Sequence, residues 1–170
     1  LMALRLDARE GWAALVLMSI VSAALGFLGF MTSPAEMDPA VQALFGSPVR
    51  TALIQCGALA LTGVLAFWVG ARFGGTGRLS QALVLVAWAQ VPPILLQLAQ
   101  IAAMLIAPAL APLIGLAGFA LYAVLLSLFI AELHGFRSAL LVFLGLMVTS
   151  FLVAIIAAVL IALLIGVPHV

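Results

Sequence analysis

The chain has 170 residues, of which 68% are hydrophobic and 6% are charged, and its formal net charge is +1. A soluble domain is roughly 45–50% apolar and about 25% charged, and a chain of this size cannot bury so much apolar surface in a soluble core. This composition excludes a soluble enzyme, a nucleic-acid-binding protein and a disordered tail, and it predicts a protein dissolved in lipid. The single cysteine, Cys56, excludes a disulfide framework and a cysteine-cluster metal site.

Five apolar segments are long enough to cross a bilayer, which requires roughly 20 residues each. We expect these spans at about residues 12–31, 51–71, 81–107, 109–131 and 138–166. The predicted fold is therefore an all-α polytopic membrane bundle, with residues 12–166 forming one domain. Residues 1–11 are short and amphipathic and are interpreted as an interfacial segment, with Trp12 at the level of the lipid headgroups. Residues 167–170 form a short tail.

The third segment is interrupted by Pro92 and Pro93, which lack backbone N–H groups and clash with the preceding turn of a helix. Such a break survives in lipid where side chains or neighbouring helices satisfy the freed carbonyl groups. We favour one helix that is kinked at Pro92-Pro93. The alternative is a broken helix or re-entrant pair of the kind found in transporters.

The distribution of arginine predicts the orientation of the chain. With five spans, five arginines share one side of the membrane with the start of the chain, and only Arg50 lies on the other; the five are Arg5, Arg9, Arg72, Arg78 and Arg137. We expect a cytoplasmic N-terminus and a periplasmic C-terminus. The absence of Lys and Asn from an Ala-, Gly-, Leu- and Arg-rich chain indicates a GC-rich bacterial genome and hence the cytoplasmic (inner) membrane.

The predicted spans carry no ionisable side chain at mid-depth, which argues against a proton relay, an ion-coupled transporter or haem ligation. The polar residues that remain include Gln90, Gln97 and Gln100, whose spacing places them on one face of a helix. We favour a hydrogen-bonded seam that holds helices together and caps the carbonyls freed by the prolines. The alternative is the polar lining of a solute path, and Gln55, Thr62, Thr149 and Ser150 could face the same seam.

Two turns on the predicted cytoplasmic side carry the remaining candidate residues. The first contains Arg72, Gly74, Gly75, Gly77 and Arg78; it lacks the Gly-Lys-[Ser/Thr] ending of a phosphate-binding loop, so we interpret it as a tight turn that needs positive φ angles. The second contains Glu132, His134, Gly135 and Arg137. We interpret it as a solvated turn with an ion pair, the alternative being a recognition spot for a cytoplasmic partner.

Small residues recur at helical spacing in two of the spans. Ala154, Ala158 and Ala162 do so in the fifth span, and Ser22 and Gly26 do so in the first. Small side chains let helices approach closely, so we expect close helix packing at these positions, with a neighbour in the same chain or in a second one.

Three short stretches resemble the bacterial branch of the Yip1-domain family of five-span membrane proteins. They are residues 74–79, which resemble the family's Gly-Gly-x-Gly loop, residues 87–92, an aromatic-containing stretch that ends in proline, and residues 134–136, a His-Gly pair before the last span. The resemblance implies a five-span bundle with a cytoplasmic N-terminus and no known catalytic residues. The acidic Asp-Leu-x-Gly-Pro motif of the eukaryotic branch is not found, so roles in GTPase binding and vesicle traffic are not carried over.

The leading functional hypothesis is a non-catalytic membrane scaffold or accessory subunit. Its expected partners are membrane lipid and other integral membrane proteins or a second copy of the chain, and we expect no cofactor, metal or nucleic acid. The alternative is a passive transporter or channel for a small solute or lipid along the glutamine seam. A membrane enzyme would require Glu132 and His134 to act on a headgroup with no nucleophile or metal-ligand spacing nearby, so we expect no catalysis.

Overall fold

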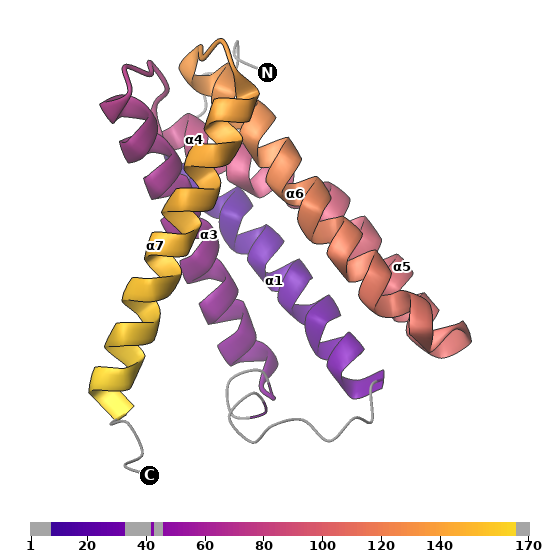
Figure 1. Cartoon of the computed structure of the whole chain (residues 1–170). Helices are drawn as coiled ribbons and strands as arrows, with labels where there is room; N and C mark the ends of the chain where they lie inside the picture. The colour runs from indigo at the N-terminus through magenta and orange to yellow at the C-terminus, as the bar shows by residue number, and fades with distance from the viewer. Residues whose placement is uncertain (1–7, 33–41, 43–45, 166–170) are drawn as a thin grey trace.

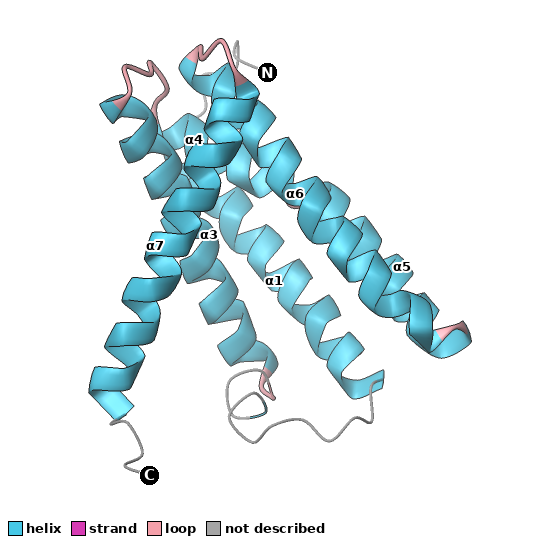
Figure 2. Ribbon diagram, in the orientation of Figure 1, coloured by secondary structure: helices cyan, strands magenta, loops and turns pink. Residues whose placement is uncertain are grey.

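The computed structural model describes residues 8–32, 42 and 46–165, and these residues form helices and no strand (Figures 1 and 2). The helices follow one another along the chain as α1 (Ala8–Thr32), α3 (Pro48–Arg72), α4 (Leu79–Ala89), α5 (Val91–Ile106), a short 3₁₀ turn η1 (Pro108–Leu110), α6 (Ala111–His134) and α7 (Ala139–Ile165).

Five helical segments are long and apolar enough to cross a membrane, which confirms the predicted all-α polytopic bundle. They cover residues 9–32, 48–72, 79–106, 108–134 and 139–160, so most extend a few residues beyond the predicted apolar runs. The extra residues include charged ones such as Arg9, Arg72 and Glu132, because a helix can continue into the headgroup region after the apolar run has ended. Of the expected interfacial segment, residues 8–11 already belong to α1, and residues 1–7 lie outside the described residues, as does the tail at 167–170.

The third span is a single kinked helix, as the sequence predicts. Helices α4 and α5 meet at Gln90, whose φ of −76° and ψ of −19° keep the backbone in the right-handed helical region. The Gln90 N–H donates to the Ala87 carbonyl at 3.2 Å, and the Ile94 N–H donates to the Gln90 carbonyl at 3.0 Å. Pro92 and Pro93 have no N–H to continue the ladder between these two bonds. The chain therefore bends without reversing its direction, unlike a re-entrant pair.

Helix α1 lies at the centre of the bundle and packs against α3, α4 and α5, while α6 packs against α5 and α4 (Figure 1). The largest fully buried side chains include Leu15 of α1, Leu83 and Val86 of α4, and Leu126 of α6. Helix α4 is short and contributes most of its residues to this core. Helix α7 differs, because its main neighbour is α6 and none of its side chains between residues 139 and 160 is buried.

The start of α1, the turn after α3 and the turn after α6 lie at the same end of the bundle (Figure 1). This end carries Arg9, Arg72, Arg78 and Arg137, and we call it the arginine-rich end. Arg50, near the start of α3, lies at the opposite end. The charge asymmetry that the sequence predicts is therefore present in the folded chain.

Candidate functional site

His134 is the last residue of α6 and is buried, with only 3% of its surface exposed. The helix ends there because Gly135 adopts a left-handed conformation, with a φ of +71°. The Gly135 N–H donates to the Glu132 carbonyl at 3.3 Å and the Phe136 N–H donates to the Ala131 carbonyl at 2.8 Å. This pair of bonds is a Schellman motif, which glycine favours because it has no Cβ to oppose a positive φ. The turn thus directs the His134 side chain inward.

Both nitrogens of the His134 ring have hydrogen-bond partners from other parts of the chain. Nε2 lies 3.1 Å from the Ala66 carbonyl, and Nδ1 accepts the Gly77 N–H at 3.3 Å. Because a carbonyl only accepts and an N–H only donates, the ring is neutral and carries its proton on Nε2. The ring also stacks on Phe136, with 5.4 Å between the ring centroids. A single side chain therefore connects α3, the turn after α3 and the turn after α6.

Glycines make the space that the His134 ring occupies. A Cβ atom added to Gly70 or Gly75 would overlap the ring, and one added to Gly77 would press on the ring and on Leu133. Gly74 has a φ of +83°, which lets the turn fold back so that the Gly75 N–H donates to the Gly70 carbonyl at 2.9 Å. We call His134 with Ala66, Gly70, Gly75 and Gly77 the histidine–glycine junction.

The junction corrects the interpretation of the second turn. The prediction of a solvated turn holds for Glu132 and Arg137, which are exposed, but it is wrong for His134. Within the described residues no ion pair between Glu132 and Arg137 is present, so the expected ion pair is also not found. Sequence reasoning placed both turns on one side but did not connect them. It also missed Gly70 and Ala66, which lie inside an apolar helix where no charge or motif distinguishes them.

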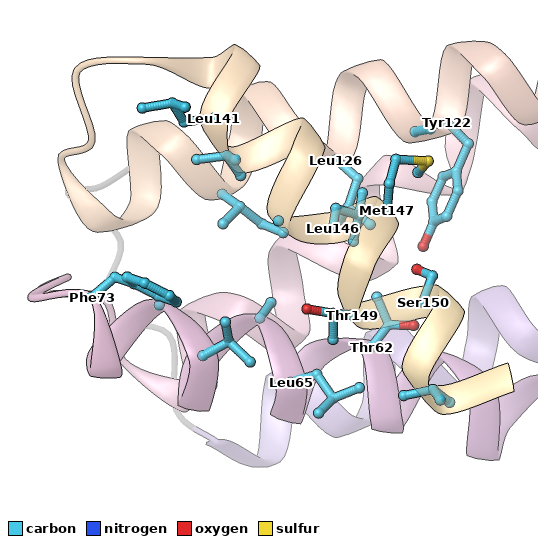
Figure 3. Close-up of a pocket in the computed structure, with 18 of the residues that line it drawn as sticks. Thr62, Leu65, Phe73, Tyr122, Leu126, Leu141, Leu146, Met147, Thr149 and Ser150 are labelled. Carbon is cyan, nitrogen blue, oxygen red and sulfur yellow. The ribbon is translucent and has the colours of Figure 1, made fainter. Parts of the chain in front are cut away.

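Beside the junction, helices α3, α6 and α7 enclose an open pocket of about 790 Å³, which we call the α3–α7 groove (Figure 3). Helix α6 contributes Tyr122, Leu126 and Ile130, and the two walls come from α3 and α7. The wall residues include Thr62, Leu65, Leu146, Thr149 and Ser150. The groove exists because α7 packs mainly on α6 and does not close against α3. Phe73, Phe136 and Arg137 line its arginine-rich end.

A few hydroxyl groups interrupt the apolar lining of the groove at the end away from Phe73 and Arg137 (Figure 3). Thr62 donates to the Ala58 carbonyl of its own helix at 2.8 Å. The Tyr122 hydroxyl is buried and has no hydrogen bond of normal geometry to any described residue. Thr62, Thr149 and Ser150 therefore line this groove, whereas the sequence had linked them to the glutamine seam.

The three glutamines are not gathered in one lining. Gln97 donates from Nε2 to the Ser22 carbonyl of α1 at 3.4 Å, whereas Gln100 lies against Gly115 of α6. Gln90 is buried at the kink, with 6% of its surface exposed. A Cβ atom at Gly26 would lie only 3.3 Å from Gln97 Nε2, so the Ser22–Gly26 pair marks a close approach of α1 and α5. These contacts support a packing role for the glutamines, and none of the three lines the α3–α7 groove.

The alanines of α7 have no close helix neighbour in the described chain. Ala154, Ala158 and Ala162 are exposed, although Ala154 lines the far end of the groove. Close packing at these positions stays a prediction that concerns a second chain. The described residues contain no group of three or more His, Cys, Asp or Glu side chains arranged to hold a metal ion.

Comparison with known protein families gives a match over most of the chain. The family model of the Yip1 domain matches residues 3–165, almost the whole chain, including both turns that form the histidine–glycine junction. No curated protein and no solved structure shows significant similarity to the chain.

Proposed function

This chain belongs to the Yip1-domain family, and on that premise we propose that it is a non-catalytic membrane scaffold or accessory subunit. It would act by holding another membrane component, a lipid or a helix of a second protein, in the α3–α7 groove. The histidine–glycine junction would fix the position of the groove's arginine-rich end. A junction whose polar groups are already paired within the chain suits a structural role better than a catalytic one.

The observation that carries this proposal is the open groove itself. Its volume of about 790 Å³ lies within the range of roughly 300–1,000 Å³ that is typical of ligand pockets. Its lining is apolar, and a membrane-spanning helix forms one wall without packing on the opposite wall. In a bilayer such a hollow is filled by lipid or by protein, because an unfilled void sacrifices dispersion contacts along its whole surface.

We also propose that the arginine-rich end faces the cytoplasm, with the chain in a bacterial inner membrane. The excess of Arg on short loops at that end supports this orientation. The groove would then lie in the cytoplasmic leaflet, and α7 would deliver the C-terminus to the periplasm.

Photo-crosslinking in native membranes tests the proposal. A photoreactive amino acid replaces Gly145, which lines the groove on α7 and has no atom within 4 Å of an added Cβ. The matched control replaces Gly57 of α3, which has the same free space but lies outside the groove. We expect a discrete adduct from position 145 alone. Equal adducts from both positions, or none from either, would contradict the proposal.

A further inference from the structure

We propose that the α3–α7 groove holds an anionic phospholipid, with its phosphate on the Arg137 guanidinium and an acyl chain along the apolar walls. This inference deepens the proposed function and rests on it, since it names the component that the groove binds. Three properties of the groove carry it: its length, the charge at its arginine-rich end and the character of its walls.

The length of the groove matches one leaflet of a bilayer. On α3 the lining extends from Ala58 to Phe73, which corresponds to about 22 Å at 1.5 Å per residue, and on the α7 wall it extends from Arg137 to Ala154, which corresponds to about 25 Å. One leaflet with its headgroups is about 20–22 Å thick, half of the 40–45 Å of a whole bilayer. A partner helix would run through the full hydrocarbon core of about 30 Å and would extend past the groove on both walls. The groove therefore fits a lipid of one leaflet better than a spanning helix.

The charge at the arginine-rich end suits a phosphate group. Arg137 lines the groove there, and it forms no ion pair with any described residue. Glu132, the acidic residue of the same turn, is exposed and does not line the groove. Helix α7 begins at Ala139 beside Arg137, so the positive end of its dipole adds to the same field. A guanidinium binds a phosphate through paired, charge-assisted hydrogen bonds.

The walls between Arg137 and the hydroxyl groups suit an acyl chain. On α7 about 20 Å separates Arg137 from Ser150, and the intervening lining is mostly Leu, Val, Met and Gly. Phe73 and Phe136 flank the entrance at the level where aromatic side chains meet lipid headgroups. The hydroxyls of Thr149 and Ser150 do not demand a polar ligand, because each can rotate to bond a carbonyl of its own helix, as Thr62 does.

Lipid retention by the purified full-length chain tests the inference. The chain is reconstituted in vesicles of equal parts phosphatidylglycerol and phosphatidylcholine with identical acyl chains, extracted in mild detergent, and the bound lipid is identified by native mass spectrometry. We expect retained phosphatidylglycerol to exceed phosphatidylcholine about 5- to 10-fold, because both lipids offer a phosphate to Arg137 but the choline cation of phosphatidylcholine offsets the attraction. Inorganic phosphate added at millimolar concentration should not displace it, because the acyl chain supplies much of the affinity.

Three variants locate the bound lipid. Arg137→Gln should reduce the ratio to about one, whereas Arg72→Gln should preserve it, because Arg72 stacks on Trp68 outside the groove. Gly145→Phe should fill the groove and abolish retention of both lipids, while Gly57→Phe, placed outside the groove, should retain them.

The possible outcomes separate this inference from the proposed function. Equal retention of the two lipids in the unmodified chain, or a ratio that Arg137→Gln leaves unchanged, would overturn the anionic-lipid assignment and leave the groove as a binding site. A protein helix instead of lipid in the groove would overturn it in the same way. If Gly145→Phe retains lipid as the unmodified chain does, the groove holds nothing specific and both proposals fail.

Discussion

The two sides of α6 differ in how closely they are packed. On the side of α3 and α4, at the arginine-rich end, the histidine–glycine junction pairs its polar groups within the chain and leaves no room for an extra methyl group at Gly70 or Gly75. On the side of α7, the same helix faces a groove of about 790 Å³, whose α3 wall includes Ala66 and Gly70 of the junction and in which the buried Tyr122 hydroxyl has no hydrogen bond of normal geometry to a described residue. Tight packing fixes the geometry of the first region, while the second is left open to the membrane. The junction is thus the rigid region of the bundle, and the groove is the region to which we assign binding in the proposed function.

Replacing His134 with Ala should have the largest effect on stability, because it removes the central side chain of the histidine–glycine junction. The Gly77 N–H would lose its acceptor, at about 1–3 kcal/mol for a buried group left unsatisfied, and a cavity would remain, while the Ala66 carbonyl would lose its bond to the ring and keep its place in the hydrogen-bond ladder of α3. We expect a loss of about 3 kcal/mol in the free energy of unfolding, measured by denaturant titration in detergent micelles. Arg137→Gln is the control and should change that free energy by less than about 0.5 kcal/mol. Equal, small effects of the two variants would show that the junction does not stabilise the fold.

Gly70→Ala sharpens the comparison through a double-mutant cycle. In the unmodified chain the added methyl group overlaps the His134 ring and should cost about 1–3 kcal/mol. In a His134→Ala background the overlap is gone, and the same change should stabilise the chain by up to about 1 kcal/mol through helix propensity. Thermal unfolding of the four proteins measures the coupling. An identical cost in both backgrounds would mean that Gly70 and His134 do not share space.

Gln97→Leu should have a smaller effect, since it acts in neither region. Its hydrogen bond to the Ser22 carbonyl is long, and interhelical bonds of this kind contribute about 0.6 kcal/mol in membranes. The unfolding free energy should fall by about that amount, measured as for His134→Ala. The transport hypothesis makes a different prediction, namely solute flux into vesicles that this variant abolishes without unfolding the bundle. Flux with that dependence would shift the functional assignment from the groove to the glutamine seam.

The sequence predicts the fold well because membrane spans have a simple physical signature. Five apolar runs of sufficient length, a proline pair and an arginine bias lead to five spans, a kinked third helix and one arginine-rich end, all of which the structure has. The positive φ angles expected in the first turn are present at Gly74 but not at Gly75 or Gly77, and the positive φ of Gly135 in the second turn was not predicted.

The candidate site is much harder to predict from the sequence than the fold. His134 sits between charged residues in the chain, so its burial depends on where the turn after α3 folds, about 57 residues away. The groove depends on the angle at which α7 leaves α6, and an almost uniformly apolar helix has no polar face to indicate that angle. The glutamine spacing indicated one face of one helix, but the kink and the two neighbours of α5 direct Gln97 and Gln100 to different helices.

The most direct test of the account compares what accompanies the chain out of its native membrane when the groove is open and when it is filled. The unmodified chain, Gly145→Phe and Gly57→Phe are extracted in mild detergent, and the protein and lipid in each preparation are quantified. The account predicts a stoichiometric component with the unmodified chain and with Gly57→Phe, and its loss from Gly145→Phe. The same component in all three preparations would contradict the claim that the α3–α7 groove is the binding site of this membrane protein.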